Sequence, residues 1–390
     1  MIKKHFISSK SQIKKNETFS LDRFKKPFCF KETKKKYKVY QYPKFVDKKF
    51  WKIKNKIKKP ILVISGPARN GNHLLLSLLD GHSEITPHPG EDDFLRSFFS
   101  FVNLNEKNSI QKLKKWNLKF IYELSGQPNF VNKNPRGINK WKELFRLYKD
   151  NEKSLIWSGN QPENEGHVQD YQDLVPEIDY LKFSESLKKN KIKKIDNFFD
   201  FLYLYLEATK KLAYKLKLKK STKYQYRISG SGLRREMFYL MKNIDSIKLI
   251  CPIRSFEGFY YSYAKTRHKL NKKFSQKALN DMWEHWRHKV IDFLILKKKY
   301  PDKVMIVKYD QLTNNTKLTM KKICSFLKIK FENVLLEPTV FNQKSLGNSS
   351  FKKSKDLKGK IYKTDSKFPT NVKIPAEYRD ILKLINQLSG

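Results

Sequence analysis

The chain has 390 residues, and 83 Lys and Arg against 38 Asp and Glu give it a formal net charge of +45. Hydrophobic residues make up 39% of it, and apolar runs recur after residue 60, which excludes disorder throughout. No stretch approaches the roughly 20 apolar residues that cross a bilayer, and the N-terminus MIKKHFISSK lacks the apolar core of a signal peptide. Cys29, Cys251 and Cys324 show no metal-ligand spacing. These features favour a cytoplasmic protein without a membrane span or a metal site.

The positive charge raises the question of nucleic-acid binding, because basic proteins attract phosphate backbones. Only 12 of the 83 basic residues are Arg, the side chain that bidentate phosphate recognition favours. No zinc-finger, basic-zipper or RNA-recognition signature interrupts the sequence. A lysine-rich solvated surface explains the charge equally well. We therefore expect no nucleic-acid partner, and a non-catalytic anion- or nucleic-acid-binding module stays as an alternative.

The first 59 residues form a basic, Lys-rich arm, and an abrupt change in composition follows them. Residues 61–65, ILVIS, are an apolar run typical of a buried parallel strand. The segment GPARNG, residues 66–71, predicts a loop. The next residues, HLLLSLLDG, predict a buried helix that ends at Gly81. The pattern is therefore a strand, a glycine-containing loop and a helix.

A second region of this kind begins after residue 225. Residues 246–253 and 303–309 predict buried strands, and the helices expected after them begin near Phe256 and at residues 275 and 317. Strands that alternate with helices predict a central parallel sheet with helices on both faces. We assign this domain to residues 60–355, with a helical insert at 100–220. The chain after Pro338 is expected to be polar, Lys-rich and loop-like, and residues 356–390 are its Lys-rich C-terminal tail.

The glycine spacing in the first loop is that of a phosphate-binding P-loop, in which backbone N–H groups and a helix N-terminus hold an anion. The sequence therefore predicts a P-loop NTPase-like, three-layer α/β fold. Nucleotide triphosphatases place a Lys and a Ser or Thr after the second glycine, to reach phosphates and hold magnesium. Asn72 and His73 stand there instead, and Arg69 lies inside the loop. A magnesium-dependent kinase or triphosphatase is thus a weaker alternative, and a tight turn with a chance Arg also stays open.

A second candidate anion site begins at Arg254, which ends the strand predicted at 246–253. Ligands of open α/β folds bind at this end of the strands. Ser262 follows eight residues later, almost two turns into the expected helix. A guanidinium and a hydroxyl together suit one dianionic phosphate. By itself an Arg at a strand end is as often structural, so its weight depends on the preceding loop.

Together these motifs resemble those of sulfotransferases that use 3′-phosphoadenosine 5′-phosphosulfate (PAPS). The segment ISGPARNGNHLLLSLLDGHSEI is similar to the family's 5′-phosphosulfate loop, and CPIRSFEGFYYS to its 3′-phosphate element. The family places small hydroxyl residues where this chain has Asn72 and His73. The resemblance covers about residues 60–95 and 225–355. The cofactor contacts that it implies are Arg69, Asn70, Gly71, Asn72, His73, Arg254, Ser262, Tyr309 and, in a closing loop, Ser349 with Ser350 and Lys352.

The resemblance implies transfer of a sulfuryl group from PAPS to a hydroxyl or amine, with release of adenosine 3′,5′-bisphosphate (PAP) and without a metal. Arg69 would stabilise the charge on the bridging oxygen. In a tyrosylprotein-type subgroup, a Gly-Glu pair supplies the base, which corresponds here to Glu91. His88, Asp92 and Asp93 are rival bases, and a helix-capping role for Glu91 also stays open.

The sequence leaves the identity of the acceptor open, and the insert at 100–220 is expected to form much of the acceptor pocket. Aromatic residues are frequent in 100–220, and because rings stack on sugars we favour a saccharide. A small metabolite, a lipid head group and a peptidyl tyrosine remain alternatives. Three other residues have structural interpretations: His82 as a donor to backbone near the cofactor loop, and Trp283 and Trp286 as packing between helix and sheet.

Overall fold

A computed structural model describes the parts of the chain that build the sheet and its covering helices. The residues described are 28–37, 60–86, 202, 206, 223–224, 226–229, 235–266, 276–340, 343–344, 359–361 and 373–389. Of the expected insert at 100–220, Leu202 and Leu206 are described, and both are helical and buried. The remainder of the insert, Glu91 and Ser349 lie outside the described residues.

Within the described residues, four parallel strands form the central sheet, in the order β4-β3-β5-β6. Their bounds are β3 Ile61–Ile64, β4 Tyr226–Ser229, β5 Ile247–Ile253 and β6 Val304–Lys308. Strand β3 lies inside the sheet, because Ile61 pairs with Tyr226 on one side and with Ile247 on the other. The sequence predicted β3, β5 and β6, and β4 is the strand it did not predict.

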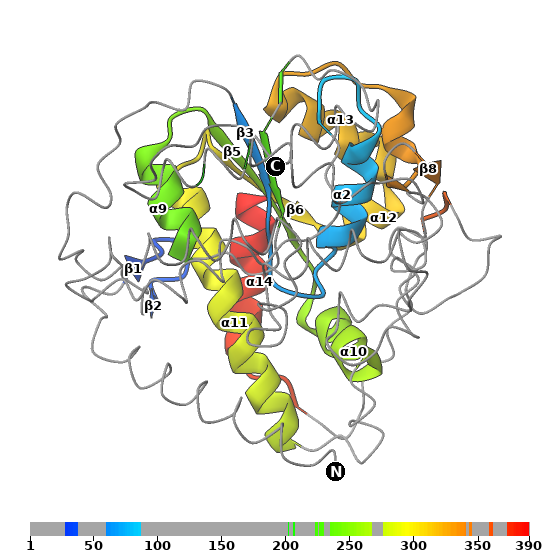
Figure 1. The fold of residues 1–390 in the computed structure, drawn as a ribbon. Coiled ribbons are helices and arrows are strands. Elements are labelled where there is room, and N and C mark those ends of the chain that lie inside the picture. Colours follow the sequence, from blue (N-terminus) through cyan, green and yellow to red (C-terminus); the bar gives the residue numbers. More distant parts are fainter. Residues whose placement is uncertain are drawn as a thin grey trace, which may run out of the picture.

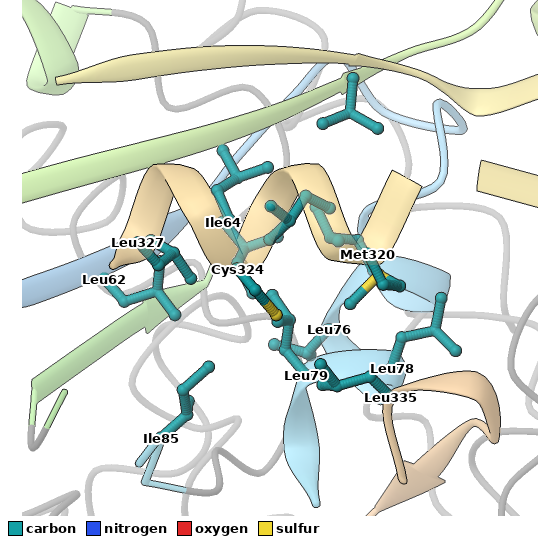
Figure 2. Packing of buried hydrophobic residues seen from close by; sticks show 14 of the residues in the cluster. Leu62, Ile64, Leu76, Leu78, Leu79, Ile85, Met320, Cys324, Leu327 and Leu335 are labelled. Carbon is teal, nitrogen blue, oxygen red and sulfur yellow. The ribbon is translucent and has the colours of Figure 1, made fainter. Parts of the chain in front are cut away.

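Helices cover both faces of this sheet (Figure 1), so the predicted three-layer α/β architecture is confirmed. On one face, α2 (Asn72–Asp80) and α13 (Thr316–Leu327) pack against Leu62 and Ile64. Figure 2 shows Leu76 and Leu79 of α2 beside Cys324 of α13 in this core. The other face carries α9 (Arg235–Asn243), α11 (Gln276–Lys299) and α14 (Glu377–Leu388). No helix within the described ranges is long and apolar enough to cross a membrane.

The connections complete the described chain. They are α10 (Phe256–Thr266), α12 (Tyr309–Asn314), the 3-10 helix η5 (Asn333–Leu336) and two small antiparallel hairpins, β1 (Phe28–Cys29) with β2 (Lys36–Tyr37) and β7 (Thr339–Val340) with β8 (Gln343–Lys344). Helix α10 begins at the residue expected for it. Helix α12 follows β6 directly, so Tyr309 stands at the carboxyl end of a strand of the main sheet.

Part of the N-terminal arm is attached to the domain. In the β1–β2 hairpin, Phe30 and Tyr37 are buried and their rings meet edge to face, 5.6 Å between centroids. Glu32 forms an ion pair with Lys298 of α11, and Lys35 forms one with Asp380 of α14. Residues 28–37 are therefore part of the folded body.

The C-terminal tail corrects the sequence interpretation. It was expected to be loop-like, but residues 377–388 form α14, which packs on α11 and β6. Its buried residues, Tyr378, Ile381, Leu384 and Ile385, recur at helical spacing and so form one apolar face. This apolar repeat is short and lies in a Lys-rich tail, so the sequence did not reveal it. The helix is stabilised mainly by its packing against the rest of the domain.

Candidate functional site

The loop after β3 takes the expected course from strand to helix. Gly71 adopts φ 100° and Arg69 adopts φ 63°, and the N–H of Leu75 donates to the Gly71 carbonyl at 3.0 Å, which starts α2. A Cβ at Gly66 would lie 2.4 Å from the Pro252 carbonyl oxygen of β5. The loop therefore depends on glycine at its start, to approach the neighbouring strand, and at Gly71, to turn into the helix.

Two asparagine amides brace this loop from within. Asn70 is fully buried; its Nδ2 donates to the Ala68 carbonyl at 2.9 Å, and its Oδ1 accepts the backbone N–H of Arg254 at 2.6 Å. Asn72 Nδ2 donates to the carbonyls of Gly66 and Pro67, at 3.3 and 3.2 Å. Both side chains thus have protein partners. Any contact that these two residues make with a ligand would fall mainly to their backbone N–H groups.

Arg254 is a buried cation at the end of β5. Only 6% of its surface is exposed, and its guanidinium carbon lies 4.5 Å from the centroid of the Tyr309 ring, a cation–π contact. Burial lowers the pKa of Arg254, although the nearby Tyr309 and Asp310 partly offset this effect. Its carbonyl accepts the indole N–H of Trp286 at 3.2 Å. Tyr309 therefore holds the guanidinium of Arg254, and Trp286 holds its main chain.

The first turn of α10 makes room for this arginine. A Cβ at Gly258 would lie 2.4 Å from Arg254 Nε, so the arginine stem crosses the helix at the glycine. Ser262 follows Gly258 by four residues, which puts both on one face of α10. Ser262 is buried, with 9% of its surface exposed. The spacing predicted from the sequence therefore brings Arg254 and Ser262 to the same side of one helix.

Tyr309 lies between the loop at 66–71 and Arg254. A Cβ at Gly71 would lie 2.4 Å from Tyr309 Cδ2, so the ring rests directly against the loop while Arg254 lies over it. β3, β5 and β6 are adjacent parallel strands, and loop, arginine and tyrosine stand at their carboxyl ends. The chain order reverses between β3 and β5, which is where open α/β sheets bind ligands. Gly71, Arg254 and Tyr309 are thus brought together at one edge.

The remaining candidates divide into placed and unplaced residues. Arg69 is half-buried in the loop, and His73 is half-buried in the first turn of α2. The closing-loop candidates, Ser349, Ser350 and Lys352, lie outside the described residues, as do Glu91 and its rivals His88, Asp92 and Asp93. Among the described residues, no three His, Cys, Asp or Glu side chains gather into a group that could hold a metal.

The three residues given structural interpretations have such roles. Trp283 and Trp286 of α11 are buried, and their rings pack against Phe256 of α10 and Tyr378 of α14. His82 is also buried; its Nε2 lies 2.8 Å from the Lys330 carbonyl and its Nδ1 accepts the Glu84 N–H at 3.0 Å. His82 therefore donates to backbone after α13, and not to the loop at 66–71.

The sequence did not predict that three residues support Arg254 and the start of α10, namely Trp286, Gly258 and Tyr378. The glycine four residues after Arg254 was a usable signal, since it stands on the helix face that an arginine stem would cross. Tyr378 had no such signal, because 122 residues separate it from Phe256, its hydrogen-bond partner.

Comparisons with known proteins agree with the motifs. The model of the sulfotransferase family matches residues 60–333. A sulfotransferase domain from the Synechococcus PCC 7002 olefin synthase aligns with 16% identity and a TM-score of 0.43, over 86% of this chain and 96% of that one. A sulfotransferase domain from the curacin biosynthetic pathway aligns with 14% identity and a TM-score of 0.43, over 85% and 99%. A search of curated proteins finds no match.

Proposed function

Because this chain belongs to the sulfotransferase family, we propose that it transfers the sulfuryl group of PAPS to a hydroxyl or amine acceptor and releases PAP. The observation that carries the proposal is that the two elements we assign to anion binding meet at adjacent strand ends. The loop at 66–71 follows β3, Arg254 follows β5, and the 2.6 Å bond from the Arg254 N–H to Asn70 joins them. A nucleotide with phosphate groups on both sides of its ribose suits such a pair.

The chemistry of the donors fits this nucleotide. Residues with positive φ, here Arg69 and Gly71, are typical of loops whose backbone N–H groups surround an anion. Arg254 is a desolvated cation, which attracts an anion more strongly than an exposed one does. In the proposed arrangement the loop takes the 5′-phosphosulfate, and Arg254 with Ser262 takes the 3′-phosphate. Tyr309 lies between the two.

When bound, PAPS supplies an activated sulfuryl group. The acceptor oxygen or nitrogen forms a bond to sulfur while the bond from sulfur to the bridging oxygen breaks, and the electron pair stays on the 5′-phosphate of PAP. The proton of the acceptor passes to a carboxylate, which we assign to Glu91. Arg69 stabilises the negative charge that develops on the bridging oxygen. Neither role requires a metal.

The acceptor and the compartment are further parts of the proposal. We infer a saccharide acceptor from the aromatic residues of 100–220, since rings stack on sugars, and a cytoplasmic location from the sequence features given above. Sulfation assays with saccharides, peptidyl tyrosines and lipid head groups in parallel would test the first inference. Transfer to tyrosine or lipid alone would contradict it.

The donor is tested by calorimetric binding of PAP and ADP, each with and without Mg²⁺, at moderate salt. We expect PAP to bind in the micromolar range or tighter, regardless of Mg²⁺, and more tightly than ADP. The reason is that ADP lacks the 3′-phosphate that Arg254 and Ser262 would hold. Equal or stronger binding of ADP that depends on Mg²⁺ would contradict the proposal and favour phosphoryl chemistry.

The base is tested by Glu91→Gln. This change removes the proton acceptor but alters the side-chain volume little, so turnover should fall by about 100-fold or more while PAP affinity stays nearly unchanged. Initial rates and PAP calorimetry on the same preparation check both parts. Asp92→Asn is the matched control and should retain turnover. If Glu91→Gln keeps full turnover, the base is another residue.

A further inference from the structure

The start of α10 is held by a residue from the far C-terminal helix. The N–H of Phe256, the first residue of α10, donates to the hydroxyl of Tyr378 in α14 at 3.2 Å. Two residues on, the N–H of Gly258 donates to Ser255 Oγ at 3.2 Å. The first N–H groups of a helix have no partner inside the helix. The Tyr378 hydroxyl therefore satisfies a group of the turn that carries Arg254.

Tyr378 is itself fixed on several sides. It is 7% exposed, and its ring centroid lies 6.2 Å from that of Phe256, 5.9 Å from that of Trp283 and 5.7 Å from that of Trp286. Its hydroxyl donates to the Glu257 carboxylate. Burial, and then this hydrogen bond, raise the pKa of Tyr378, so the hydroxyl keeps its proton. One oxygen thus bridges two successive residues of α10, as acceptor and as donor.

The helix that presents this tyrosine is anchored independently of α10. Glu377 accepts from Arg287 Nε of α11 at 2.7 Å, and Asn386 accepts from Lys308 of β6 at 3.2 Å. The ion pair of Lys35 with Asp380 adds the N-terminal hairpin. The Tyr378 hydroxyl is therefore a fixed point of the domain, and not a group that follows α10.

Three points hold the main chain around the arginine. Asn70 accepts the Arg254 N–H, Trp286 donates to the Arg254 carbonyl, and Tyr378 accepts the Phe256 N–H two residues on. We propose that Tyr378 is a positioning residue for recognition of the 3′-phosphate: its hydroxyl sets the first turn of α10 so that Arg254 and Ser262 face the same phosphate. This inference rests on the proposed function, and it adds α14 to the nucleotide site.

The test is Tyr378→Phe, which keeps the ring in its aromatic cluster and removes only the hydroxyl. Calorimetry measures the dissociation constants of PAP and of 5′-AMP, which lacks the 3′-phosphate, and the ratio of the two reports recognition of that group. We expect the variant to lower this preference for PAP by about five- to tenfold, the equivalent of one hydrogen bond. Affinity for 5′-AMP should change little. Amide hydrogen exchange at Phe256 should become faster.

Tyr224→Phe is the matched control. Tyr224 is also buried, its hydroxyl donates to the Leu327 carbonyl at 3.1 Å, and it precedes the first residue of β4, at the opposite end of the sheet from Arg254. Both variants should lower the melting temperature, and Tyr378→Phe should lower it more, because its hydroxyl makes two hydrogen bonds and that of Tyr224 makes one. Only Tyr378→Phe should change the preference for PAP.

The outcomes separate the two proposals. If the unmodified protein binds PAP and 5′-AMP equally well, the proposed function fails. If it prefers PAP strongly and Tyr378→Phe keeps that preference, the proposed function stands and the positioning role of Tyr378 is overturned. A loss of preference equal to that of the control would overturn it as well, since the effect would then reflect stability alone.

Discussion

Arg254→Ala should weaken PAP binding by about 100-fold, the effect of losing hydrogen bonds between a cation and a phosphate dianion. The arginine is 6% exposed, and burial lowers its pKa, so water screens little of the interaction that the substitution removes. Affinity for 5′-AMP should change little, because the loop at 66–71 remains. The measurement is calorimetry with both nucleotides.

Folding stability gives the same variant a second readout. Burial of a cation has a desolvation cost, and an alanine does not carry it. The cation–π contact with Tyr309 is lost in exchange. We therefore expect the melting temperature of Arg254→Ala to stay close to that of the unmodified protein, so that weaker PAP binding cannot be ascribed to unfolding.

Arg379→Ala is the control for charge. Arg379 is exposed on α14, and its removal lowers the net charge by the same amount. It should leave PAP affinity almost unchanged. If the two variants weaken binding by a similar small factor, and if binding falls steeply with salt, then the general positive charge of the protein attracts the nucleotide and no 3′-phosphate clamp exists.

The second large effect is expected from Gly71→Ala. Gly71 has φ 100°, a conformation that costs an L-residue about 1–2 kcal/mol. The new Cβ would also lie 2.4 Å from Tyr309 Cδ2, so either the loop or the tyrosine ring must move. Because Arg254 lies over that ring, we expect the substitution to weaken binding both at the loop and at Arg254. PAP and 5′-AMP should each bind at least tenfold more weakly.

Gly359→Ala separates backbone strain from the effect on the site. Gly359 also has a positive φ, 75°, but a Cβ there would meet the Lys344 side chain, at 3.0 Å from its Cδ. This flexible side chain can move away. The control should show a comparable loss of stability in thermal melts but normal nucleotide binding. Normal binding by Gly71→Ala would contradict the placement of the nucleotide beside this loop.

Sequence patterns predicted the parts of the fold that local chemistry decides. The runs that became β3, β5 and β6 are short, apolar and bounded by loop residues, so burial on both faces was evident. β4 was missed because its segment, YRIS, contains an arginine. Arg227 is nonetheless buried, and its guanidinium donates to the carbonyls of Leu76 and Thr86 at 2.8 and 3.3 Å. Those partners come from distant parts of the chain.

The site divides in the same way. The loop at 66–71 and the spacing from Arg254 to Ser262 are local, and both were found from the sequence. The bond between Asn70 and Arg254 joins residues 184 positions apart, and no pattern marks it. Asn72 and His73 stand where the family has hydroxyl residues that contact the ligand. The Asn72 amide instead donates back into the loop, to the carbonyls of Gly66 and Pro67, and this direction depends on how the loop packs. Glu91 stays a prediction.

The place of Tyr378 in the chain has a consequence for protein synthesis. All four strands of the sheet leave the ribosome before α14 does, and Tyr378 follows Phe256 by 122 residues. The strands can therefore pair in the nascent chain by their own packing before α14 is made, and the contact that fixes the first turn of α10 forms after the framework around it.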